Sequence, residues 1–408
     1  MSTRKEKIPI VRFRAFSEPW FQNQLSEVAE FSKGRGYSKK AIQPQGTPII
    51  LYGRLYTKYE SVISNIDTYA NMEKNSVISE GGEVIIPASG ESAAEISRAS
   101  CVTDGGVILG GDINIVKPHE NLDPSFIAIT LSNGSQQREL SKRAQGKSVV
   151  HLHNSDLKAV KLFYPSYEEQ SAIGSLFRTL DDLLASYKDN LANYQSLKVT
   201  MLSKMFPKAG ETVPKIRLDG FEGEWEVVNL GTLIENYDEI ISGVSGFPIA
   251  TSSRKGLYLQ NDYFEGGRTG IDLTLDFHRV PMGYVTYRHM SDDSIFKFNK
   301  NNFETDVLVS KEYPVFMSND SSDIDFILYH LNNSRLFLRF STMQKLGGTR
   351  VRLYYKNLIT YKLAVPTIKE QQAIGSYFSN LDNLINSHQE KISQLETLKK
   401  KLLQDMFI

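Results

Sequence analysis

A stretch near the middle of the chain is repeated at its C-terminal end. The first copy, PSYEEQSAIGSLFRTLDDLLASYKDNLANYQSLKVTMLSKMF, begins at Pro165, and the second, PTIKEQQAIGSYFSNLDNLINSHQEKISQLETLKKKLLQDMF, begins at Pro366. The copies align without a gap at an offset of 366 − 165 = 201 residues, so that Glu169 matches Glu370. A register kept over this length indicates an internal duplication, which restricts the fold to two related halves.

Each copy predicts one long helix. Apolar residues recur every three or four positions, as in a helix that packs on another helix through a narrow seam. Neither copy has an interior proline, and a helix from Glu169 to Lys204 would be about 54 Å long at roughly 1.5 Å per residue. Because such a helix cannot bury its stripe alone, we expect the two helices to pack together as a spacer; the alternative is that each packs only on its own domain. The predicted seam residues are Leu184, Leu191, Leu197, Ile385, Ile392, Leu395 and Leu402.

The front of each half is also duplicated. IPIVRFRAFSEPWFQNQL begins at Ile8, and VPKIRLDGFEGEWEVVNL begins at Val213. Between these openings and the long helices lie short β-like runs separated by Gly, Asn and Asp, with short helices predicted over 124–140 and 323–343. The middles of the two halves do not align with each other. We therefore expect an α+β fold in which two mixed α/β domains with twisted sheets share a common plan but differ in their interiors.

These observations predict a division of the chain into four segments. They are a first domain at 8–165, a first long helix at 166–207, a linker and second domain at 208–366, and a second long helix at 367–408.

The composition is that of a globular protein without a global charge. Hydrophobic residues make up 40% of the 408 residues, and 47 Lys and Arg balance 47 Asp and Glu, so any binding to nucleic acid must come from local clusters. The single cysteine, Cys101, excludes an internal disulfide and fits a reducing cytoplasm. No apolar run reaches transmembrane length, so we expect a cytoplasmic protein without a membrane partner.

The motifs of common enzymes are absent or incomplete. Gly146-Lys147-Ser148 resembles the end of a phosphate-binding loop, but Ser141 occupies the position of the first glycine. His151 and His153 alternate in a probable strand without a neighbouring Cys or HExxH motif, so we predict no metal site there. The acidic pair Asp181-Asp182 is interpreted as solvated. We therefore predict a chain that is not an enzyme, with no catalytic residue, metal or cofactor of its own.

Two stretches, 31–59 and 326–369, contain many Lys and Arg and no acidic residue. In the second, Gly347-Gly348 would allow close approach of a ligand, and Arg350 and Arg352 would project from one face of a strand. Clustered basic side chains on loops neutralise phosphates and recognise guanine edges; an ordinary solvated surface is the alternative. The candidate DNA-binding residues are Lys33, Arg35, Tyr37, Lys39, Arg54, Lys142, Arg143 and Lys147 in the first domain, and Arg254, Arg268, Arg288, Lys345, Arg350 and Arg352 in the second.

The duplicated P-x-x-x-E-Q-x-A-I-G-x-x-F-x-x-L-D segments, each continuing into a long helix and Met-Phe, resemble the specificity subunit of type I restriction-modification systems. The W-x-x-x-x-L openings and the basic segments before each helix add to this resemblance, which covers essentially the whole chain. It implies two target-recognition domains related by a pseudo-two-fold axis, and two antiparallel helices that form a coiled-coil spacer.

The resemblance also implies a function. In that family the subunit is non-catalytic and binds a bipartite, asymmetric double-stranded DNA target, one half per domain. Two methyltransferase subunits, which bind S-adenosylmethionine, and restriction/translocase subunits, which use ATP and Mg, would be its partners. Two other hypotheses remain open: a protein-interaction adaptor without sequence-specific DNA binding, and a self-sufficient enzyme such as a nuclease, which the missing motifs disfavour.

Overall fold

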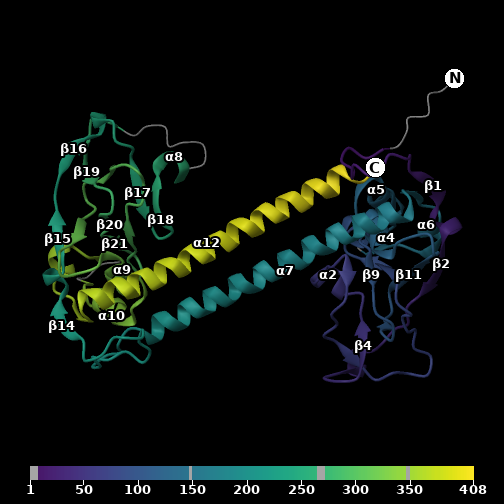
Figure 1. Cartoon of the computed structure of the whole chain (residues 1–408), viewed down its shortest axis with the longest axis horizontal. Helices are drawn as coiled ribbons and strands as arrows, with labels where there is room; N and C mark the ends of the chain where they lie inside the picture. Colours follow the sequence, from purple (N-terminus) through teal and green to yellow (C-terminus); the bar gives the residue numbers. More distant parts are fainter. Residues whose placement is uncertain (1–7, 147–148, 264–271, 346–349) are drawn as a thin grey trace. The chain divides into compact units, whose positions relative to one another are not determined.

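The computed structural model describes residues 8–146, 149–263, 272–345 and 350–408 (Figure 1). The chain divides into two compact units: unit 1 comprises Met1–Lys188 with Glu390–Ile408, and unit 2 comprises Asp189–Gln389. Each unit contains one globular α/β domain and segments of both long helices, α7 (Tyr167–Lys204) and α12 (Ile368–Asp405). The predicted pair of mixed α/β domains with two long helices is therefore confirmed.

In its described part, unit 1 contains a five-stranded and a four-stranded sheet. The first has the order β2 (Ala29–Lys33), β11 (Ile113–Pro118), β7 (Glu83–Pro87), β9 (Ser100–Val102) and β5 (Val62–Ile63). The second has the order β10 (Ile108–Leu109), β4 (Thr47–Ile50), β6 (Tyr69–Ala70) and β3 (Ile42–Gln43). Two-stranded pairs are formed by β1 (Phe21–Gln24) with β13 (Lys161–Tyr164) and by β8 (Ser89–Gly90) with β12 (Val150–His151). The helices are α1 (Leu25–Val28), α2 (Arg54–Thr57), α3 (Ala93–Ile96), α4 (Pro124–Leu131), α5 (Gly134–Arg143) and α6 (Asn154–Lys158).

The described part of unit 2 contains a four-stranded and a three-stranded sheet. The first has the order β15 (Ile234–Tyr237), β24 (Val315–Ser318), β20 (Val285–Tyr287) and β22 (Phe298–Lys300), and the second has the order β16 (Ile240–Ser242), β19 (Asp276–Val280) and β23 (Val307–Ser310). Two-stranded pairs are β14 (Glu226–Asn229) with β26 (Lys362–Val365), β17 (Ala250–Ser253) with β18 (Gly256–Leu259), and β21 (Met290–Ser291) with β25 (Val351–Arg352). The helices are α8 (Gln260–Tyr263), α9 (Ile324–Asn333), α10 (Arg335–Met343) and α11 (Tyr355–Leu358).

The two units share a central sheet that their sequences do not reveal. The order β2-β11-β7-β9 in unit 1 corresponds to β15-β24-β20-β22 in unit 2. Both sheets bury apolar residues, but the residues themselves differ, because a strand needs a buried face and not a particular side chain. The interiors that do not align in sequence therefore still have a common core, and the units differ mainly in the sheets added to it.

The predicted short helices are each divided in two. The segment 124–140 forms α4 and α5, separated at Ser132 and Asn133. The segment 323–343 forms α9 and α10, separated at Ser334, whose hydroxyl accepts hydrogen bonds from the first backbone N–H groups of α10. A Ser at this N-cap position favours a new helix start over continuation of the preceding helix. The predicted continuous helices were therefore too long.

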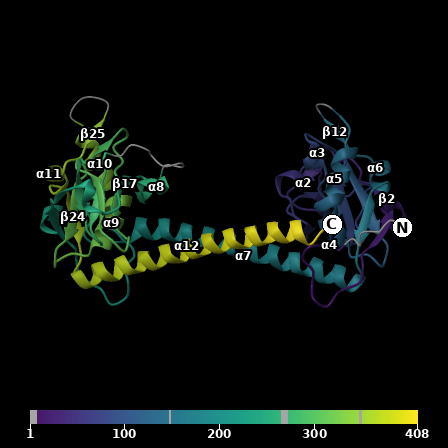
Figure 2. The same ribbon diagram turned by 90° about the horizontal axis from the view of Figure 1, so that it is seen from above.

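Within each unit, segments of the two long helices run antiparallel (Figures 1 and 2). In unit 1, Lys188 pairs with Glu396, and Asp181 pairs with Lys399. Asp181 precedes Lys188 along α7, whereas Lys399 follows Glu396 along α12, as expected for antiparallel helices. In unit 2, the paired residues are Lys198 with Asp382 and Tyr194 with His388, whose rings lie 5.1 Å apart. None of the described helices is long and apolar enough to cross a membrane.

Most of the predicted seam residues are at least partly buried. Leu184 and Ile385 are buried, and Leu191, Ile392, Leu395 and Leu402 are partly buried. Leu197 departs from the prediction, because its side chain is 38% exposed while the adjacent Lys198 faces Asp382. Further along the same helix, Met201 is partly buried and Met205 is buried in the core of unit 2, so the exposure at Leu197 is local.

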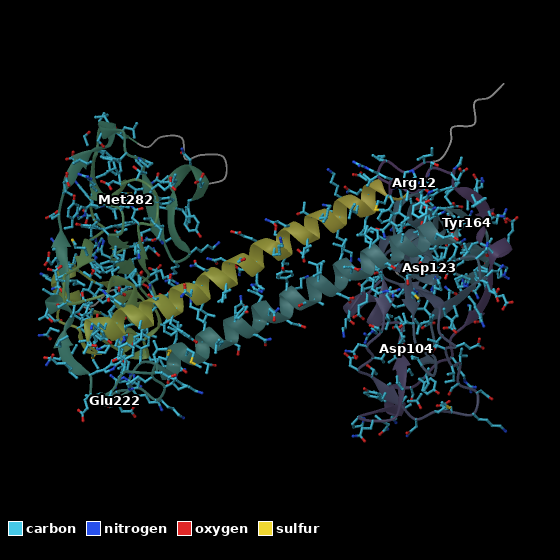
Figure 3. All side chains as sticks on the ribbon, viewed as in Figure 1. Arg12, Asp104, Asp123, Tyr164, Glu222 and Met282 are labelled. Atoms are coloured by element: carbon cyan, nitrogen blue, oxygen red, sulfur yellow. The ribbon has the colours of Figure 1, made fainter. Side chains whose placement is uncertain are left out.

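The repeated Glu-Gln pair attaches the globular domain of unit 1 to α7. Glu169 is 1% exposed and accepts two hydrogen bonds from Arg12, at 2.7 and 2.6 Å. The side-chain oxygen of Gln170 accepts a hydrogen bond from the backbone N–H of Asp123 at 3.0 Å. Asp123 in turn caps α4 through the N–H of Phe126 at 2.9 Å, and Figure 3 labels both Arg12 and Asp123.

Unit 2 reproduces these interactions. Glu370 accepts hydrogen bonds from Arg217 at 2.7 and 2.6 Å, and Gln371 accepts one from the N–H of Asp323 at 3.0 Å. Asp323 caps α9 through the N–H of Phe326 at 2.9 Å. The conserved register of the duplication therefore corresponds to one buried polar network that occurs twice.

The Met-Phe that ends each repeat also has a structural role. In unit 1, the ring of Phe407 lies 5.9 Å from Phe126 and 5.8 Å from Phe177. In unit 2, the ring of Phe206 lies 5.4 Å from Phe326 and 6.3 Å from Phe378. Each domain core is therefore completed by the Met-Phe that directly follows a long helix, α12 in unit 1 and α7 in unit 2.

Candidate nucleic-acid interface

In unit 2, candidate arginines gather around the β21–β25 pair. Arg350, just before β25, donates to Asp292, just after β21, at 2.8 Å. Arg254, in the turn between β17 and β18, makes two hydrogen bonds to Asp293, at 2.8 and 2.6 Å. These bonds lower the pKa of Asp293 to about 2. Arg352 lies exposed on β25 itself, so the structure brings these arginines to one region of the surface.

An aromatic residue adjoins this arginine cluster. The ring of Tyr354 is 43% exposed and stacks on His289 with 5.6 Å between ring centroids. Burial lowers the pKa of His289, and the nearby charges of Arg352 and Arg288 lower it further. An exposed aromatic ring supported by a buried histidine and bordered by arginines provides stacking and hydrogen-bonding groups for a nucleic acid.

The candidates in unit 1 are spread over several segments. Arg35 donates to the carbonyl of Asn75, and Tyr37 contacts Ser76, so these two candidates adjoin the same loop. Lys33 is exposed at the end of β2.

Other candidates in unit 1 are held by acidic residues. Arg54 donates to Glu60 and Asp67, and its side chain is only 9% exposed, which suits a structural ion pair better than a DNA contact. Arg143 donates to Glu139 within α5, while Lys142 beside it is exposed. The acid-free stretch 31–59 did not predict the pairings of Arg54, because Glu60 and Asp67 lie outside it.

The structure does not describe the side chains of several candidates. Lys147 and Arg268 lie outside the described residues, as do Gly347 and Gly348, and the side chain of Lys39 is not described. Lys345, at the end of the segment that follows α10, is exposed.

His151 and His153 were not among the residues predicted from the sequence to bind DNA. Both are exposed, and their rings stack with an interplanar angle of 2° and 6.3 Å between centroids. Counted at the offset of the duplication, they correspond to Arg352 and Tyr354 of unit 2. The alternation of His with Val and Leu was visible in the sequence, whereas the correspondence of β12 to the strand that carries Arg352 appears only in the structure.

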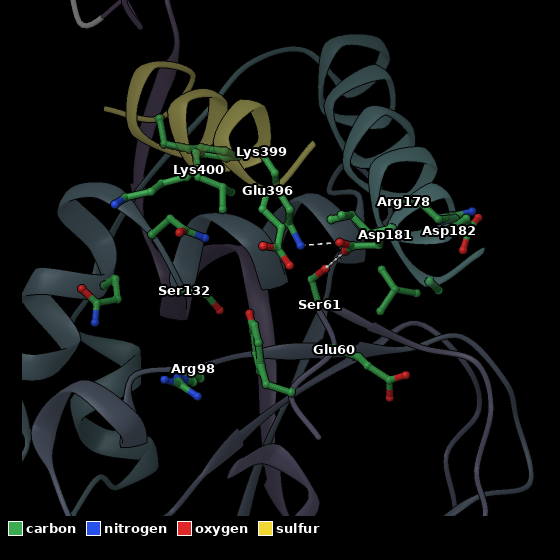
Figure 4. Close-up of a pocket in the computed structure, with 18 of the residues that line it drawn as sticks. Glu60, Ser61, Arg98, Ser132, Arg178, Asp181, Asp182, Glu396, Lys399 and Lys400 are labelled. Atoms are coloured by element: carbon green, nitrogen blue, oxygen red, sulfur yellow. Dashed lines mark hydrogen bonds and ion pairs between the residues drawn. The ribbon is translucent and has the colours of Figure 1, made fainter. Parts of the chain in front are cut away.

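A cleft of about 1370 Å³ lies between the globular domain and the helix segments of unit 1 (Figure 4). Asp181 accepts a hydrogen bond from Ser61 at 2.9 Å and pairs with Lys399 across it, while Lys188 pairs with Glu396 at 2.7 Å. The interpretation of Asp181 as a solvated surface residue was therefore wrong. The hydrogen bond from Ser61 holds α7 to the domain, and the two ion pairs join α7 to α12.

A cysteine thiol and groups of metal-ligating side chains are two other features that often serve catalysis. Cys101 is buried, and burial raises the pKa of its thiol to about 12, so it is not an activated nucleophile. Among the described residues, no three His, Cys, Asp or Glu side chains are placed to hold a metal ion.

The model of the type I restriction modification DNA specificity domain matches residues 17–219 and 259–397. Since these two matches cover most of the sequence, the chain belongs to the type I restriction-modification DNA specificity family. Recognition of a DNA target is the role of this domain, and the chain is a specificity subunit that acts with other restriction-modification subunits.

Individual relatives agree with this family. The specificity subunit of the type I restriction enzyme MjaVIII from Methanocaldococcus jannaschii is 20% identical over 408 aligned positions, covering 95% of this chain and 91% of the relative. The MjaX protein of the same organism is 24% identical over 322 positions, covering 72% and 70%. The crystal structure of the type I restriction-modification S subunit from M. genitalium shares the fold, with a TM-score of 0.59, 13% identity and coverage of 98% and 99%.

Proposed function

We propose that this specificity subunit recognises a bipartite, asymmetric double-stranded DNA target, with one half recognised by each unit. The observation that supports this proposal is the contrast between a shared core and different exposed residues. The order of four core strands, the Asp caps and the buried ion pairs are the same in both units, whereas the exposed residue is His151 in β12 and Arg352 in β25, and His153 and the exposed Tyr354 lie just after these strands. Two similar supports with different surface chemistry suit two different half-sites.

The chain itself is not the catalyst. We propose that two methyltransferase subunits bind it and supply the S-adenosylmethionine chemistry on adenine, and that restriction/translocase subunits supply the ATP- and Mg-dependent steps. The twofold character of the chain supports two methyltransferase copies, because each unit contains the same network of Glu-Gln, Asp cap and long-helix segment. A repeated support offers the same attachment surface twice.

Methylation of genomic DNA tests this function directly. The chain would be expressed with its methyltransferase partner, and modified adenines would be mapped by sequencing in cells with and without the chain. We expect methylation at one two-part target with an unread gap, and none without the chain. If the partner assembles with the chain but the complex shows no sequence preference, the alternative of a protein-interaction adaptor is the correct one.

We further propose that α7 and α12 determine the length of the unread gap. Insertion of seven helix-forming residues into both helices preserves the heptad register and adds about 10 Å of helix at roughly 1.5 Å per residue. The half-sites should remain the same while the gap lengthens by about three base pairs, at roughly 3.4 Å per base pair. An unchanged gap in the methylation map would exclude this role for the helices.

A further inference from the structure

The pairs β8–β12 and β21–β25 occupy the same place in the two units. The register Val150 with Gly90 in unit 1 is reproduced by Val351 with Ser291 in unit 2, at the offset of the duplication. Figure 2 shows β12 and β25 each at the end of its unit that lies farthest from the long helices. Each pair is therefore a two-stranded ribbon at the tip of a domain.

Burial along the two ribbons separates structural from exposed positions. The inward residues are of the same kind in both units: Val150 and Leu152 in β12 and the following segment correspond to Val351 and Leu353, and all four are buried. The outward residues differ, because His151 and His153 of unit 1 correspond to Arg352 and Tyr354 of unit 2. The fold thus requires the inward residues, whereas the outward ones are exposed, with stacking contacts between His151 and His153 and between Tyr354 and His289.

Each ribbon is connected to polar or basic neighbours. In unit 2 the ion pairs Arg350–Asp292 and Arg254–Asp293 flank the ribbon. In unit 1, Asn114 donates to the carbonyl of Leu152 at 2.8 Å and pairs in register with the exposed Lys33 of β2. In unit 2 the aspartates balance the charges of Arg350 and Arg254, so the positive charge beside the ribbons comes from the exposed Lys33 in unit 1 and the exposed Arg352 in unit 2, where a phosphate backbone could approach.

We propose that these two ribbons enter the major groove of DNA and that their outward side chains contact base edges: His151 and His153 in one half-site, and Arg352 and Tyr354 in the other. This inference rests on the proposed function and assigns the residues that determine its specificity. The major groove of B-DNA admits a two-stranded β-ribbon, and alternate residues of a strand face the same side. The Arg352 guanidinium can donate two hydrogen bonds to O6 and N7 of a guanine, whereas the histidine rings offer a different donor and acceptor pattern.

The test compares ribbon variants with matched controls in the complex with the methyltransferase partner. The variants are His151→Ala/His153→Ala and Arg352→Ala/Tyr354→Ala. The controls are Lys161→Ala and Lys362→Ala, which remove exposed lysines at equivalent positions of the other two-stranded pairs, β13 and β26. Binding would be measured on duplexes in which each half-site is altered one base pair at a time, and methylation would be mapped in cells.

We expect each ribbon variant to reduce discrimination in one half-site only, by about 10–100-fold at the contacted base pairs. The exchange variant His151→Arg/His153→Tyr should alter the preferred bases of that half-site, and the lysine controls should leave discrimination within about threefold of the parent protein. Because the replaced side chains are exposed, unfolding midpoints should remain close to the parent value.

The outcomes separate the two proposals. A parent complex that shows no two-part specificity would refute the proposed function itself. A parent complex with normal two-part specificity, together with ribbon variants that discriminate as well as the lysine controls, would overturn only the assignment of the ribbons.

Discussion

The side chains of units 1 and 2 differ most at exposed positions and least in the buried polar networks. Their buried polar networks contain the same residue types with the same distances, since Arg12–Glu169 and Arg217–Glu370 both have hydrogen bonds of 2.7 and 2.6 Å. Their additional sheets differ, and so do the outward residues of the tip ribbons. The comparison shows that a duplicated protein can keep its folding interactions while each half changes its binding surface independently.

The largest expected effect tests the buried Arg–Glu ion pair that both units contain. Replacing Arg12 or Arg217 with Ala leaves a buried glutamate without its partner, and breaking such a pair costs about 3–5 kcal/mol. We expect nearly equal losses in the two units, measured by denaturant unfolding followed through tryptophan fluorescence. Arg14→Ala, which removes a neighbouring exposed arginine, should change the unfolding free energy by less than about 0.5 kcal/mol.

The two tryptophans allow each unit to be followed separately. Trp20 is buried in unit 1 and Trp225 in unit 2, and the chain has only these two. Neither indole N–H has a hydrogen-bond partner in the described part of the structure, so replacement by Phe loses no hydrogen bond. Trp225→Phe thus gives a reporter for unit 1, and Trp20→Phe gives one for unit 2. Markedly unequal losses for the Arg12 and Arg217 variants would contradict a common network.

A buried histidine should make unit 2 more acid-sensitive than unit 1. His330 lies beside Tyr361 at 2.8 Å, and burial lowers its pKa from 6.5 to about 4. The unfolded chain therefore binds a proton between pH 6.5 and 4 that the folded chain does not, so stability is lost as the pH falls through this window, by about 3 kcal/mol. Unit 1 has Thr130 at the equivalent position of α4.

The measurement is the free energy of unfolding of unit 2 at several pH values, followed through Trp225. His330→Thr, which installs the residue of unit 1, should remove this part of the pH dependence between pH 6.5 and 4. If the parent and the variant have the same slope over that range, His330 does not distinguish the two units.

Two equivalent glycines should respond unequally to the same substitution. A Cβ added at Gly375 would lie 2.6 Å from the Asp323 carboxylate that caps α9, whereas one at Gly174 would lie 3.1 Å from Asp123. We expect Gly375→Ala to destabilise unit 2 by about 1–3 kcal/mol through the displaced cap and local overpacking. Gly174→Ala should be nearly neutral, because the helix propensity of Ala, worth about 1 kcal/mol, offsets the milder contact. Thermal unfolding of the two variants would show this difference, and equal shifts would contradict it.

The sequence predicted the repeated elements well because their register is kept. The long helices and the matching of Arg12 with Arg217 follow from identity at a fixed offset. The partners of these residues did not follow, since Arg12 and Glu169 are separated by 157 positions and only folding brings them together. The common central sheet escaped detection because its strands share burial and not residue identity.

The sequence predicted the residue types of the candidate site better than it predicted the positions of these residues in the fold. Arginine-rich segments of unit 2 do meet around β21–β25, but the acid-free stretch of unit 1 does not predict that Arg54 is held by Glu60 and Asp67. Local composition reports the charge of a segment, whereas the partners that neutralise it come from elsewhere in the fold. For the same reason, the exposed His151 and His153 became recognisable as interface candidates only beside their counterparts in unit 2.

The smallest expected effect concerns an ion pair that only unit 2 has. Arg254 holds the pKa of Asp293 at about 2. At the offset of the duplication, the residue of unit 1 that matches Asp293 is Ser92. Because the folded pKa is depressed from 3.8, the associated stability is present above pH 3.8 and is lost as the pH falls toward 2; it is small, since both side chains are largely exposed. Arg254→Ala should raise the pKa of Asp293 toward 3.8 in a carboxyl NMR titration. Asp272, whose pKa is lowered by hydrogen bonds from Thr274, should titrate unchanged in the same sample. If the pKa of Asp293 does not change in Arg254→Ala, the hydrogen bonds from Ser291 and from the N–H of Ile295 position the carboxylate without the arginine. Arg254 is then not anchored there.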